Sequence, residues 1–526
     1  ISKENQTLRE RLAKLSLWDR VEQYLKNRLK NNITFIVREG DIFSSMQLHD
    51  ISLEYARTII ILGNESRNSV CRLNQLEKEE QKRKGNTLTV KTLMQVADIT
   101  GAETSADNQR IIVEITDDWT AELVRKIIKA KQVDGKCNIV PVMVNQILGQ
   151  ILSQFSLMPE LNLAYRELFS NKGATFFSRV QSKENDTEFI SNYLRTHKHA
   201  VPLTVMESDG RFFAYYSAAS EKDVITPTIV PASDYKVELN YDYHIENKNV
   251  VIIGHNSKCR DIMSGFEAFR KEWNYKDGVH EILRVIVVDD EKNLEKMNYY
   301  RDYPFVAETV VGSVYDTELI TNTIQHFTDS NEEDISILIL SDDTVSNEEV
   351  DADVLANLVY AQDLIKDKLA QDPDFDPESI DIVAEILDPK HHDVVSAYSV
   401  DNIVISNRYI SKMITQIGEK DAMFNFYTDI LTYDEDDEGG YDSKEIYAKK
   451  VSRFFKTLPG TCRADELIRA VYNASTDPSI PPEKQNPTMV LGYVKPGGRM
   501  ILFEGDHSKI EVKLEERDKI IVFSNH

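Results

Sequence analysis

The sequence contains no apolar run long enough to cross a membrane. Its longest apolar runs, such as 58–62 and 335–340, have the length of single β-strands, whereas a membrane-spanning helix needs roughly 20 apolar residues. The opening stretch, ISKENQTLRERLAKL, is charged throughout and does not resemble a secretory signal. These absences exclude a membrane-spanning helix within this sequence.

Cysteine is scarce, and positive charge is in deficit. The four cysteines have the spacing neither of a zinc site nor of a disulfide framework, which favours a reducing compartment. The net charge of -25 at pH 7 argues against a nucleic-acid partner. It makes divalent cations plausible partners, although the same charge can serve solubility alone. The 526 residues, 41% of them hydrophobic, suffice for two to four domains with apolar cores.

Glycine is missing where a dinucleotide-binding turn would need it. Residues 249–273 have the pattern of a buried strand, a glycine turn and a helix, which opens a nucleotide-binding βαβ unit. The dinucleotide fingerprint requires three glycines, but this turn has only Gly254, followed by His255, Asn256, Ser257 and Lys258. Asp289 and Asp290 end the next strand, where a carboxylate would bind ribose, yet two adjacent acids disfavour phosphate. We therefore do not expect NAD to bind here.

No catalytic constellation is recognisable either. No serine or cysteine lies in a nucleophile-elbow motif, and no Walker lysine motif is present. The histidines, such as His197, His199 and His391, have no metal-ligating partner at helical spacing. A dehydrogenase would also need the missing glycines. We therefore expect that the chain is not an enzyme.

The most informative feature of the sequence is an internal repeat. Residues 110–124 match 381–395, so that Glu114 aligns with Glu385. A second match in nearly the same register joins 35–48 to 308–320, and a third, after a short insertion, joins 57–66 to 335–344. Two matches in one register are hard to produce by chance, so the chain is predicted to contain two copies of one domain.

Each copy alternates apolar strands with amphipathic helices, which predicts a parallel α/β sheet with crossover helices. In the second copy we expect strands at 249–253, 283–288, 307–311, 335–340 and 381–386. In the first copy we expect them at 33–38, 58–62, 110–115 and 138–142. The first copy has no counterpart of the strand and glycine turn at 249–254, so we expect the chain to begin inside its first domain.

A helix with regularly spaced apolar residues follows each predicted sheet. The first, at 144–155, has apolar residues at i, i+3, i+4, i+7, i+8 and i+11, and the second covers 408–417. Such a stripe either packs in the core or forms a dimer through a crossover helix. A β-rich tail follows each helix. In the second tail, 488–506 is predicted to be a hairpin and 518–524 a closing strand.

This arrangement resembles the plan of tandem RCK domains, which are cytosolic regulators of potassium and related cation channels. In particular the sequence resembles the CASTOR/POLLUX family of ion channels. The stretches that carry the resemblance are TIIILGNES, IIVEITDDWTAELV, residues 383–414, and the ending VLGYVKPGGRMILFEGD with ERDKIIVF.

The resemblance implies an α/β fold of two tandem Rossmann-like RCK domains, the first incomplete at its N-terminus. The first domain, 1–247, would comprise a Rossmann-like lobe (1–143), crossover helices (144–172) and a small β-rich C-lobe (173–247). The second, 248–526, would comprise a Rossmann-like lobe (248–405), a crossover helix (406–433) and a C-lobe (434–526).

The resemblance also implies a function. We expect a soluble, ligand-sensing gating-ring module of a cation channel, which couples the binding of a cytosolic ligand to pore opening. Its partners would be copies of itself, in a tetrameric ring, and a membrane pore domain of the same longer chain. It would lie at the cytoplasmic face of the cell membrane, or at the nuclear envelope in a plant. The alternative is a TrkA-like, nucleotide-binding regulator of potassium uptake, whose site uses the glycine fingerprint that the second copy lacks.

The first candidate ligand site is an acidic loop with calcium-loop spacing. The stretch DEDDEGGYDSKE offers carboxylates at positions 1, 3, 5, 9 and 12 of a twelve-residue loop, with glycine at position 6. The candidate Ca²⁺ ligands are Asp434, Asp436, Glu438, Asp442 and Glu445. Glutamate is unusual at position 5, and the flanking segments predict a helix and a strand, so a solvated acidic loop is the other interpretation.

The second candidate is a cluster of carboxylates at strand ends, where open α/β sheets bind their ligands. Six acids follow or end strands of the second copy, namely Asp289, Asp290, Asp342, Asp343, Glu385 and Asp388. Carboxylates crowded together repel one another unless a bound cation, a basic side chain or water separates them. The basic side chains available in the first turn are Lys258 and Arg260.

Overall fold

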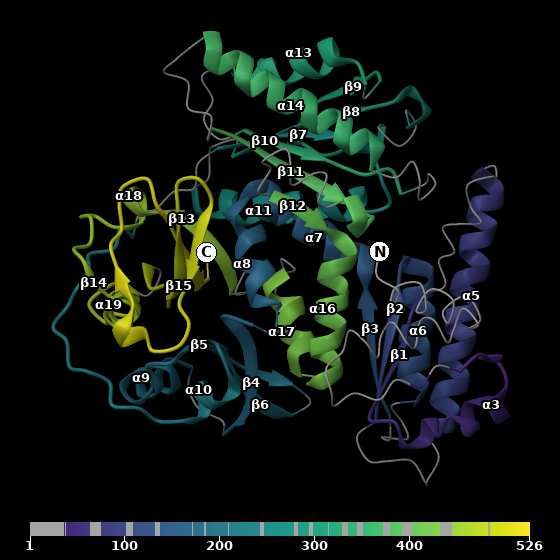
Figure 1. The fold of residues 1–526 in the computed structure, drawn as a ribbon, viewed down its shortest axis with the longest axis horizontal. Coiled ribbons are helices and arrows are strands. Elements are labelled where there is room, and N and C mark those ends of the chain that lie inside the picture. Colours follow the sequence, from purple (N-terminus) through teal and green to yellow (C-terminus); the bar gives the residue numbers. More distant parts are fainter. Residues whose placement is uncertain are drawn as a thin grey trace, which may run out of the picture.

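The structure is a computed structural model, and it describes residues 36, 38–63, 75–100, 109–131, 137–170, 172–182, 186–208, 210–241, 247–277, 282–293, 298–313, 315–328, 335–343, 351–371, 379–391, 402–420, 422–431, 444–481 and 484–525. Across these residues the chain forms two parallel sheets and two β-rich lobes, with paired helices between them (Figure 1). No helix in the described part of the chain is long and apolar enough to cross a membrane.

The second half of the chain contains a six-stranded, all-parallel sheet with the strand order β12-β11-β10-β7-β8-β9. Its strands are β7 (Lys248–Ile253), β8 (Leu283–Asp289), β9 (Val306–Val311), β10 (Ile335–Ile339), β11 (Ile380–Ile386) and β12 (Asn402–Ile405). Runs of valine and isoleucine form its central strands because both faces of the sheet are buried. The first strand lies in the middle of the sheet, which is the strand order of a dinucleotide-binding fold.

Helices cover both faces of this sheet. These are α11 (Cys259–Asp277), α13 (Thr317–Thr328) and α14 (Ala352–Gln371), with short 3-10 turns at η3 (Glu291–Asn293) and η5 (Pro389–His391). Ile324 of α13 and Leu358 of α14 pack with Val251 on one face. Phe266 of α11 packs with Val250 on the other face. Alternate residues of β7 therefore enter two separate cores.

The first half contains a shorter parallel sheet with the order β1-β2-β3. It comprises β1 (Thr58–Ile61), β2 (Gln109–Ile115) and β3 (Cys137–Met143), with α3 (Ser45–Asp50), η1 (Leu53–Tyr55), α5 (Gln75–Thr100) and α6 (Asp118–Lys131). The pairing of β1 with β2 is parallel, as is that of β10 with β11, so the predicted repeat is present at these strands. The predicted strand at 33–38 falls mostly outside the described residues, and its described residues 36 and 38 form no strand.

The last strand of each parallel sheet runs directly into a pair of helices. α7 (Val144–Leu157) and α8 (Glu160–Leu168) follow β3, while α16 (Ser406–Glu419) and α17 (Ala422–Leu431) follow β12. The predicted apolar stripe of α7 is buried within the chain, with Phe155 completely enclosed. α7 packs against α11, α16 and α17, so the stripe contributes to the core that joins the two halves.

A small β-rich lobe follows each helix pair. The first contains an antiparallel sheet of β4 (Thr175–Gln181), β5 (Ala200–Ser208) and β6 (Arg211–Ala218), with α9 (Asp186–Thr196) and α10 (Glu221–Ile225). The second contains β13 (Glu445–Lys450), α18 (Val451–Phe454), β14 (Cys462–Arg463), α19 (Ala464–Ser475), β15 (Met489–Lys495), β16 (Arg499–Leu502), η7 (His507–Lys509), β17 (Glu511–Val512) and β18 (Lys519–Ser524). The predicted hairpin is confirmed, and Gly497 and Gly498 supply the positive φ angles of its turn.

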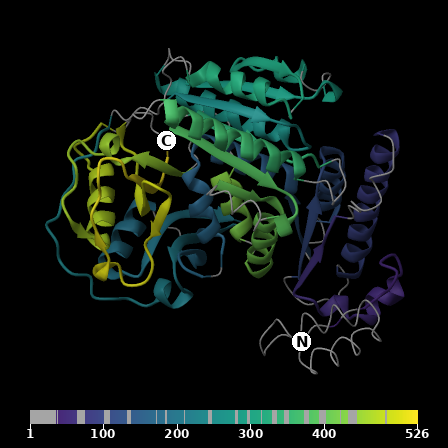
Figure 2. The same cartoon turned by 45° about the horizontal axis from the view of Figure 1, so that its top comes forward.

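The two helix pairs reach across to the opposite half of the chain. α8 contacts β13 and β16 of the second β-rich lobe, while α17 contacts β4 and β5 of the first. In the first lobe Tyr215 stacks on Phe426 of α17 at a centroid distance of 4.5 Å, and its hydroxyl donates to the carbonyl of Ala422 at 2.7 Å. The β-rich lobes therefore lie together on one side of the molecule, opposite the first parallel sheet (Figure 2).

Candidate functional site

The turn after β7 has the backbone shape of a nucleotide-binding turn. Gly254 adopts φ +93°, and its N–H donates to the carbonyl of Val288 at 3.0 Å. A Cβ atom at this position would lie 3.0 Å from the carbonyl oxygen of Leu340, so both backbone conformation and space favour glycine. α11 begins five residues later at Cys259. The predicted strand, glycine turn and helix are therefore all present.

Several N–H groups of this turn bond to atoms of the chain itself, and that of Asn256 donates to Sγ of Cys259 at 3.3 Å. Asn256, at the second glycine position of the fingerprint, is 2% exposed, and its Oδ1 accepts from the N–H of Lys258 at 3.0 Å. The N–H of Ser257 donates to Oδ2 of Asp343 at 3.1 Å. These donors precede a helix N-terminus, where a phosphate would bind in a dinucleotide fold. The carboxylate of Asp343 thus accepts a hydrogen bond that a phosphate would accept in a dinucleotide fold.

Lys258 lies buried behind this turn, between two of the predicted carboxylates. Its Nζ lies 3.1 Å from Oε1 of Glu385 and 3.9 Å from Oδ2 of Asp343. Burial favours the neutral amine, but the two carboxylates outweigh it, so the pKa of Lys258 is raised. Glu385 is completely buried and also accepts from Nδ2 of Asn256 at 2.6 Å and from the hydroxyl of Ser406.

Lys258 thus takes the neutralising role predicted for a basic residue of the first turn, whereas Arg260 does not. Arg260 points away from the strand ends and pairs with Asp118 of α6 at 2.8 Å. Both side chains of that pair are largely exposed, so this ion pair adds little stability. The pair does connect α11, which follows the glycine turn, with α6 of the first half of the chain.

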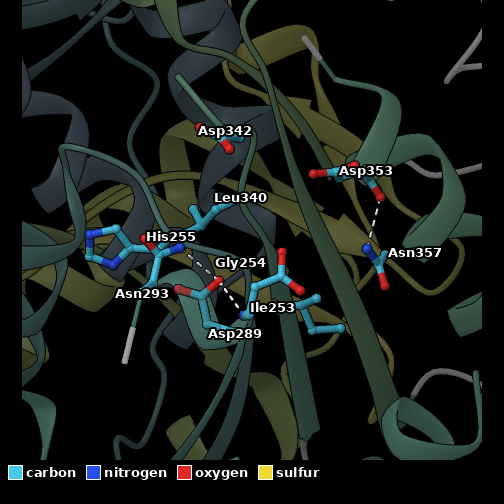
Figure 3. Close-up of a pocket in the computed structure, with 10 residues that line it drawn as sticks. Ile253, Gly254, His255, Asp289, Asn293, Leu340, Asp342, Asp353 and Asn357 are labelled. Carbon is cyan, nitrogen blue, oxygen red and sulfur yellow. Dashed lines mark hydrogen bonds between the residues drawn. The ribbon is translucent and has the colours of Figure 1, made fainter. Parts of the chain in front are cut away.

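A small pocket opens beside this network, at the carboxyl ends of β7, β8 and β10 (Figure 3). It lies where the strand order reverses on either side of β7, which is the usual ligand position in an open α/β sheet. It is a shallow hollow, and the roughly 300 Å³ of space between its walls includes open solvent. The lining residues are Ile253, Gly254, His255, Asp289, Asp290, Asn293, Leu340, Asp342, Asp353 and Asn357.

The polar groups that line the pocket are mainly carboxylates and amides. Asp289, 2% exposed, accepts at Oδ1 from Nδ2 of Asn293 at 3.1 Å. Asn357 donates to the backbone carbonyl of Asp353 at 2.8 Å, as drawn in Figure 3. His255 approaches the hydroxyl of Tyr300 at 2.5 Å. Oxygen acceptors of this kind match a cation or a ligand that donates hydrogen bonds, and they do not match a phosphate.

The six strand-end carboxylates fall into three groups. Asp289, Asp290 and Asp342 line the pocket, while Asp343 and Glu385 contact Lys258. The sixth, Asp388, lies apart and accepts from the N–H of Lys390 at 3.0 Å. Across the described ranges of the chain, no three histidine, cysteine, aspartate or glutamate side chains are arranged to hold a metal ion.

The structure adds a residue that sequence reasoning missed. Asp351 has φ +71° and a completely buried carboxylate. Its oxygens accept from the hydroxyl of Ser341 at 2.5 Å, from the N–H of Leu387 at 3.0 Å and from Nδ1 of His391 at 2.9 Å. It thereby joins the ends of β10 and β11 to the start of α14. No sequence pattern indicates this role, because the partners come from separate segments.

The predicted calcium loop lies largely outside the described residues. Only Glu445 of its five acids is described, and it is the first residue of β13, paired with Ser524. Its carboxylate is buried close to Tyr165, whose pKa is raised by burial and by this neighbouring charge. The calcium-loop prediction therefore depends chiefly on Asp434, Asp436, Glu438 and Asp442.

The fold as a whole is similar to that of a known channel gating ring. The human SLO3 gating ring matches it with a TM-score of 0.59 and 11% sequence identity, over 93% of this chain and 91% of that chain. The chain is also similar to the RCK domain of GsuK, at 11% identity over 96% of this chain and 84% of that one, with a TM-score of 0.33. The predicted Rossmann-like α/β architecture is confirmed by the strand order and by the similarity in fold to the SLO3 gating ring. No known family model matches the sequence.

The similarity to a particular protein lies in the sequence. The probable ion channel POLLUX of Oryza sativa subsp. japonica is 21% identical over 482 residues, which cover 85% of this chain and 47% of the relative. The chain therefore spans about half the length of the curated relative that it matches. This similarity confirms the resemblance to the CASTOR/POLLUX family that the sequence indicates.

Proposed function

We propose that the chain is the ligand-sensing gating-ring region of a cation channel and that it is not an enzyme. The observation that carries this proposal is the joining of two Rossmann-like sheets, two helix pairs and two β-rich lobes in one shared core. The gating-ring fold of the SLO3 relative, which extends over 93% of the chain, supports it. A ligand of such a region acts by binding one conformation of the ring better than another.

The domain division proposed is 1–247 and 248–526. It is supported by the direct passage of β3 into α7 and of β12 into α16, which marks the end of a Rossmann-like lobe in each half. It is also supported by the separate antiparallel sheets that follow each helix pair. The reciprocal contacts of α8 and α17 make the two proposed domains one interlocked unit.

The candidate pocket is connected mechanically to the first domain. A ligand in the pocket would contact the turn of Gly254 and His255, directly before α11. α11 packs closely on α7, where Gly149 faces Asp261 and Gly265 faces Ser153. Because close packing of this kind transmits small displacements, a shift of the turn would reach the first domain through α7.

Calcium is the ligand that we propose. The five acids with calcium-loop spacing are Asp434, Asp436, Glu438, Asp442 and Glu445. Glu445 is buried at the start of β13, so the candidate ligands that carry the proposal are the other four. The alternative position is the pocket, where Asp289, Asp290 and Asp342 offer carboxylate oxygens. These three are not arranged in this structure to hold a metal ion, so binding there would require them to move closer together. NAD is not proposed, because Asn256 and Asp343 already bond to the N–H groups that would hold its phosphates. For the same reason a TrkA-like nucleotide regulator remains the less favoured function.

The assembly proposed is a ring of four chains below a pore domain that belongs to the same longer protein. The ring would lie at the cytoplasmic face of the cell membrane, or at the nuclear envelope if the protein is from a plant. Both proposals are supported by the similarity to an ion channel of about twice this length. A nucleic-acid partner is not proposed, given the net charge of -25.

The test of this assembly is the mass of the purified chain in solution. Light scattering during gel filtration should give four times the chain mass of 60.3 kDa at micromolar concentration, with or without calcium. A uniform monomer at every concentration would contradict a self-assembling ring. A stable dimer would contradict the ring of four chains, although it would still show that the chain associates with itself.

A further inference from the structure

The two halves of the chain contact each other in a reciprocal way through α7 and α16. α7, from the first half, contacts β10 and β7 of the six-stranded sheet, whereas α16, from the second half, contacts β1 and β2 of the shorter sheet (Figure 1). The hydroxyl of Thr58 on β1 donates to the carbonyl of Gly418, near the end of α16, at 2.8 Å. Because both helices directly follow the last strand of a parallel sheet, these two contacts are related by the internal repeat.

The two helices differ in what covers them. α11 covers α7 so closely that a Cβ atom at Gly149 would overlap Cβ of Asp261. The buried apolar residues of α7 and α16 have the same spacing, which places Ser411 at the position of Gly149 and, one turn later, Thr415 at that of Ser153. The two residues of α7 are buried, whereas Ser411 and Thr415 are exposed. The face of α16 that corresponds to the covered face of α7 is therefore open.

The strand that α16 contacts is open at the matching place. The repeat aligns β2 with β11, and their pairing with β1 and β10 makes Ile60 the counterpart of Leu338. Leu338 is 0% exposed, in one core with β7 and α11, but Ile60 is 47% exposed. Two residues further on, Leu340 is 2% exposed, and its counterpart Leu62 is 64% exposed. Apolar side chains that β7 and α11 cover in the second half thus have counterparts at the surface in the first half.

The backbone of β1 lies at the edge of its sheet. In the described part of the chain β1 pairs on one side only, with β2, whereas β10 has β11 on one side and β7 on the other. An edge strand presents N–H and carbonyl groups to which a further strand can pair. The edge of β1 and the open face of α16 therefore form a surface with the outline of the one that β7 and α11 cover in the second half.

The open face of α16 is basic. Arg408 and Lys412 lie on it one turn apart, beside Thr415, and neither has a carboxylate partner among the described residues. Nζ of Lys412 instead donates to the carbonyl of Arg166 at 2.8 Å. Burial lowers the pKa of Lys412, and the neighbouring charges of Arg408 and Arg166 lower it further. A helix with an acidic residue on its inner face, as α11 has Asp261, complements this surface.

We propose that a further strand–turn–helix unit of the same protein binds this surface. Its strand pairs with the edge of β1, and its helix packs over Ile60 and Leu62 and on α16 across Ser411 and Thr415. In both respects the unit is the first-half counterpart of 248–277. β1 belongs to the first half of the chain and α16 to the second, so a displacement of the bound unit acts on both halves at once.

The register of the repeat places this unit ahead of Ile1. The POLLUX relative, about twice as long as this chain, has the length to include it. The inference rests on the proposed function in one respect, because it takes the chain to be a region of a longer protein. It depends neither on the ligand nor on the number of chains in the ring, so it holds or fails independently of both.

Amide hydrogen exchange tests the proposal, with residues 1–526 alone and with the same chain extended by the residues that precede Ile1 in the full-length protein. Peptides that cover 57–63 and 407–416 report on β1 and on α16. Protection factors at 57–63 should be about tenfold higher in the extended chain, because an edge strand that gains a partner is protected from exchange. Those at 407–416, whose amides already form helical hydrogen bonds, should rise about threefold.

Substitutions on one element are read out on the other. In the extended chain Ile60→Lys should abolish the rise at 407–416, and Ser411→Trp should abolish the rise at 57–63. Both side chains are exposed in residues 1–526 alone, so both variants should fold there with a nearly unchanged melting temperature. Ile225→Lys is the matched control, because Ile225 is 46% exposed on α10, and it should leave both rises in place.

Three results would overturn the proposal. The first is equal protection of 57–63 in the two chains. The second is a rise at 57–63 that survives Ser411→Trp, since the bound segment would then not touch α16. The third is protection of 57–63 in residues 1–526 alone that grows with protein concentration, because a second copy of the chain would then occupy the surface.

Discussion

Nζ of Lys258 lies 3.1 Å from Oε1 of Glu385, inside the second Rossmann-like lobe and directly behind the turn that follows β7. Both side chains are almost fully buried. Glu385 aligns with Glu114 in the internal repeat, and Glu114 accepts from the N–H of Gly63 at 2.8 Å. The same position in each copy thus holds a glutamate near the carboxyl end of a strand, where it accepts a hydrogen bond from a turn that contains glycine.

The buried pair gives a first prediction. Lys258→Met leaves Glu385 without its cation in the interior, so the free energy of unfolding should fall by about 3–5 kcal/mol. The pKa of Lys258 is raised, so the stabilisation is complete below the ordinary lysine pKa and is lost only at more alkaline pH. The pair of the unmodified chain is therefore intact at both pH 6 and pH 8. In the variant the buried carboxylate can relieve its charge by taking up a proton, so the loss should be larger at pH 8 than at pH 6. Urea unfolding at both pH values measures it.

Two comparisons isolate the pair. The double variant Lys258→Met with Glu385→Gln removes the uncompensated charge and should recover part of the loss. Lys366→Met removes a surface cation that pairs with Asp363 at 3.2 Å and is 72% exposed, and should cost less than about 0.5 kcal/mol. A Lys258→Met chain as stable as Lys366→Met would contradict the buried network.

The packing of α7 on α11 gives a second prediction. An alanine at 149 would overlap Cβ of Asp261 and would approach the backbone of Ile262 at 3.0 Å. Gly149→Ala should therefore lower the free energy of unfolding by about 1–3 kcal/mol. Gly418→Ala is the matched control, because its nearest contact is Cγ2 of Thr58 at 3.5 Å. Thermal unfolding distinguishes the two, and equal midpoints would show that the helices are not in close contact.

The buried histidine of the second β-rich lobe gives a third prediction. Burial lowers the pKa of His507 to about 4, whereas a histidine of the unfolded chain titrates near pH 6.5. Below that pH the unfolded chain takes up a proton that the folded chain refuses, so the free energy of unfolding falls as the pH falls. His507 should account for a loss of about 2 kcal/mol between pH 7 and pH 5.

His507→Gln removes this source of pH dependence. Its free energy of unfolding should fall by about 2 kcal/mol less than that of the unmodified chain over the same interval, in urea titrations at pH 7 and pH 5. An identical pH dependence in the two proteins would mean that His507 is accessible to protons in the folded state.

Much of the fold could be predicted from local patterns. Strands β7, β8, β10 and β11 are runs of valine and isoleucine, and such runs form buried parallel strands wherever helices cover both faces. The hairpin of β15 and β16 was predictable because consecutive glycines supply its turn. β12 was not predicted, because it has four residues and passes directly into α16.

The site was predictable only in part. The strand-end position of the acids follows from strand direction, so Asp289, Asp342 and Asp343 were correctly placed at one edge of the sheet. Their partners were not predictable, since nothing local distinguishes Lys258, which turns inward to Glu385, from Arg260, which turns outward to Asp118. Asp351 escaped prediction for the same reason, because its hydrogen bonds join segments that only the folded chain brings together.

The central claim, that the chain senses a ligand and that this ligand is calcium, is tested most directly by calorimetric titration of the intact chain. Calcium should bind saturably, and binding should disappear when Asp434, Asp436 and Asp442 are all changed to asparagine. Glu445 is left intact because it is buried in β13.

A second variant, with Asp289 and Asp342 changed to asparagine, locates the site if the loop variant still binds. Loss of calcium binding in that variant alone would place the ligand in the pocket and would still agree with a calcium-sensing gating ring. Titrations with magnesium and NAD complete the measurement. A chain that binds NAD saturably and does not respond to calcium would contradict the account and would favour a nucleotide-regulated potassium-uptake protein.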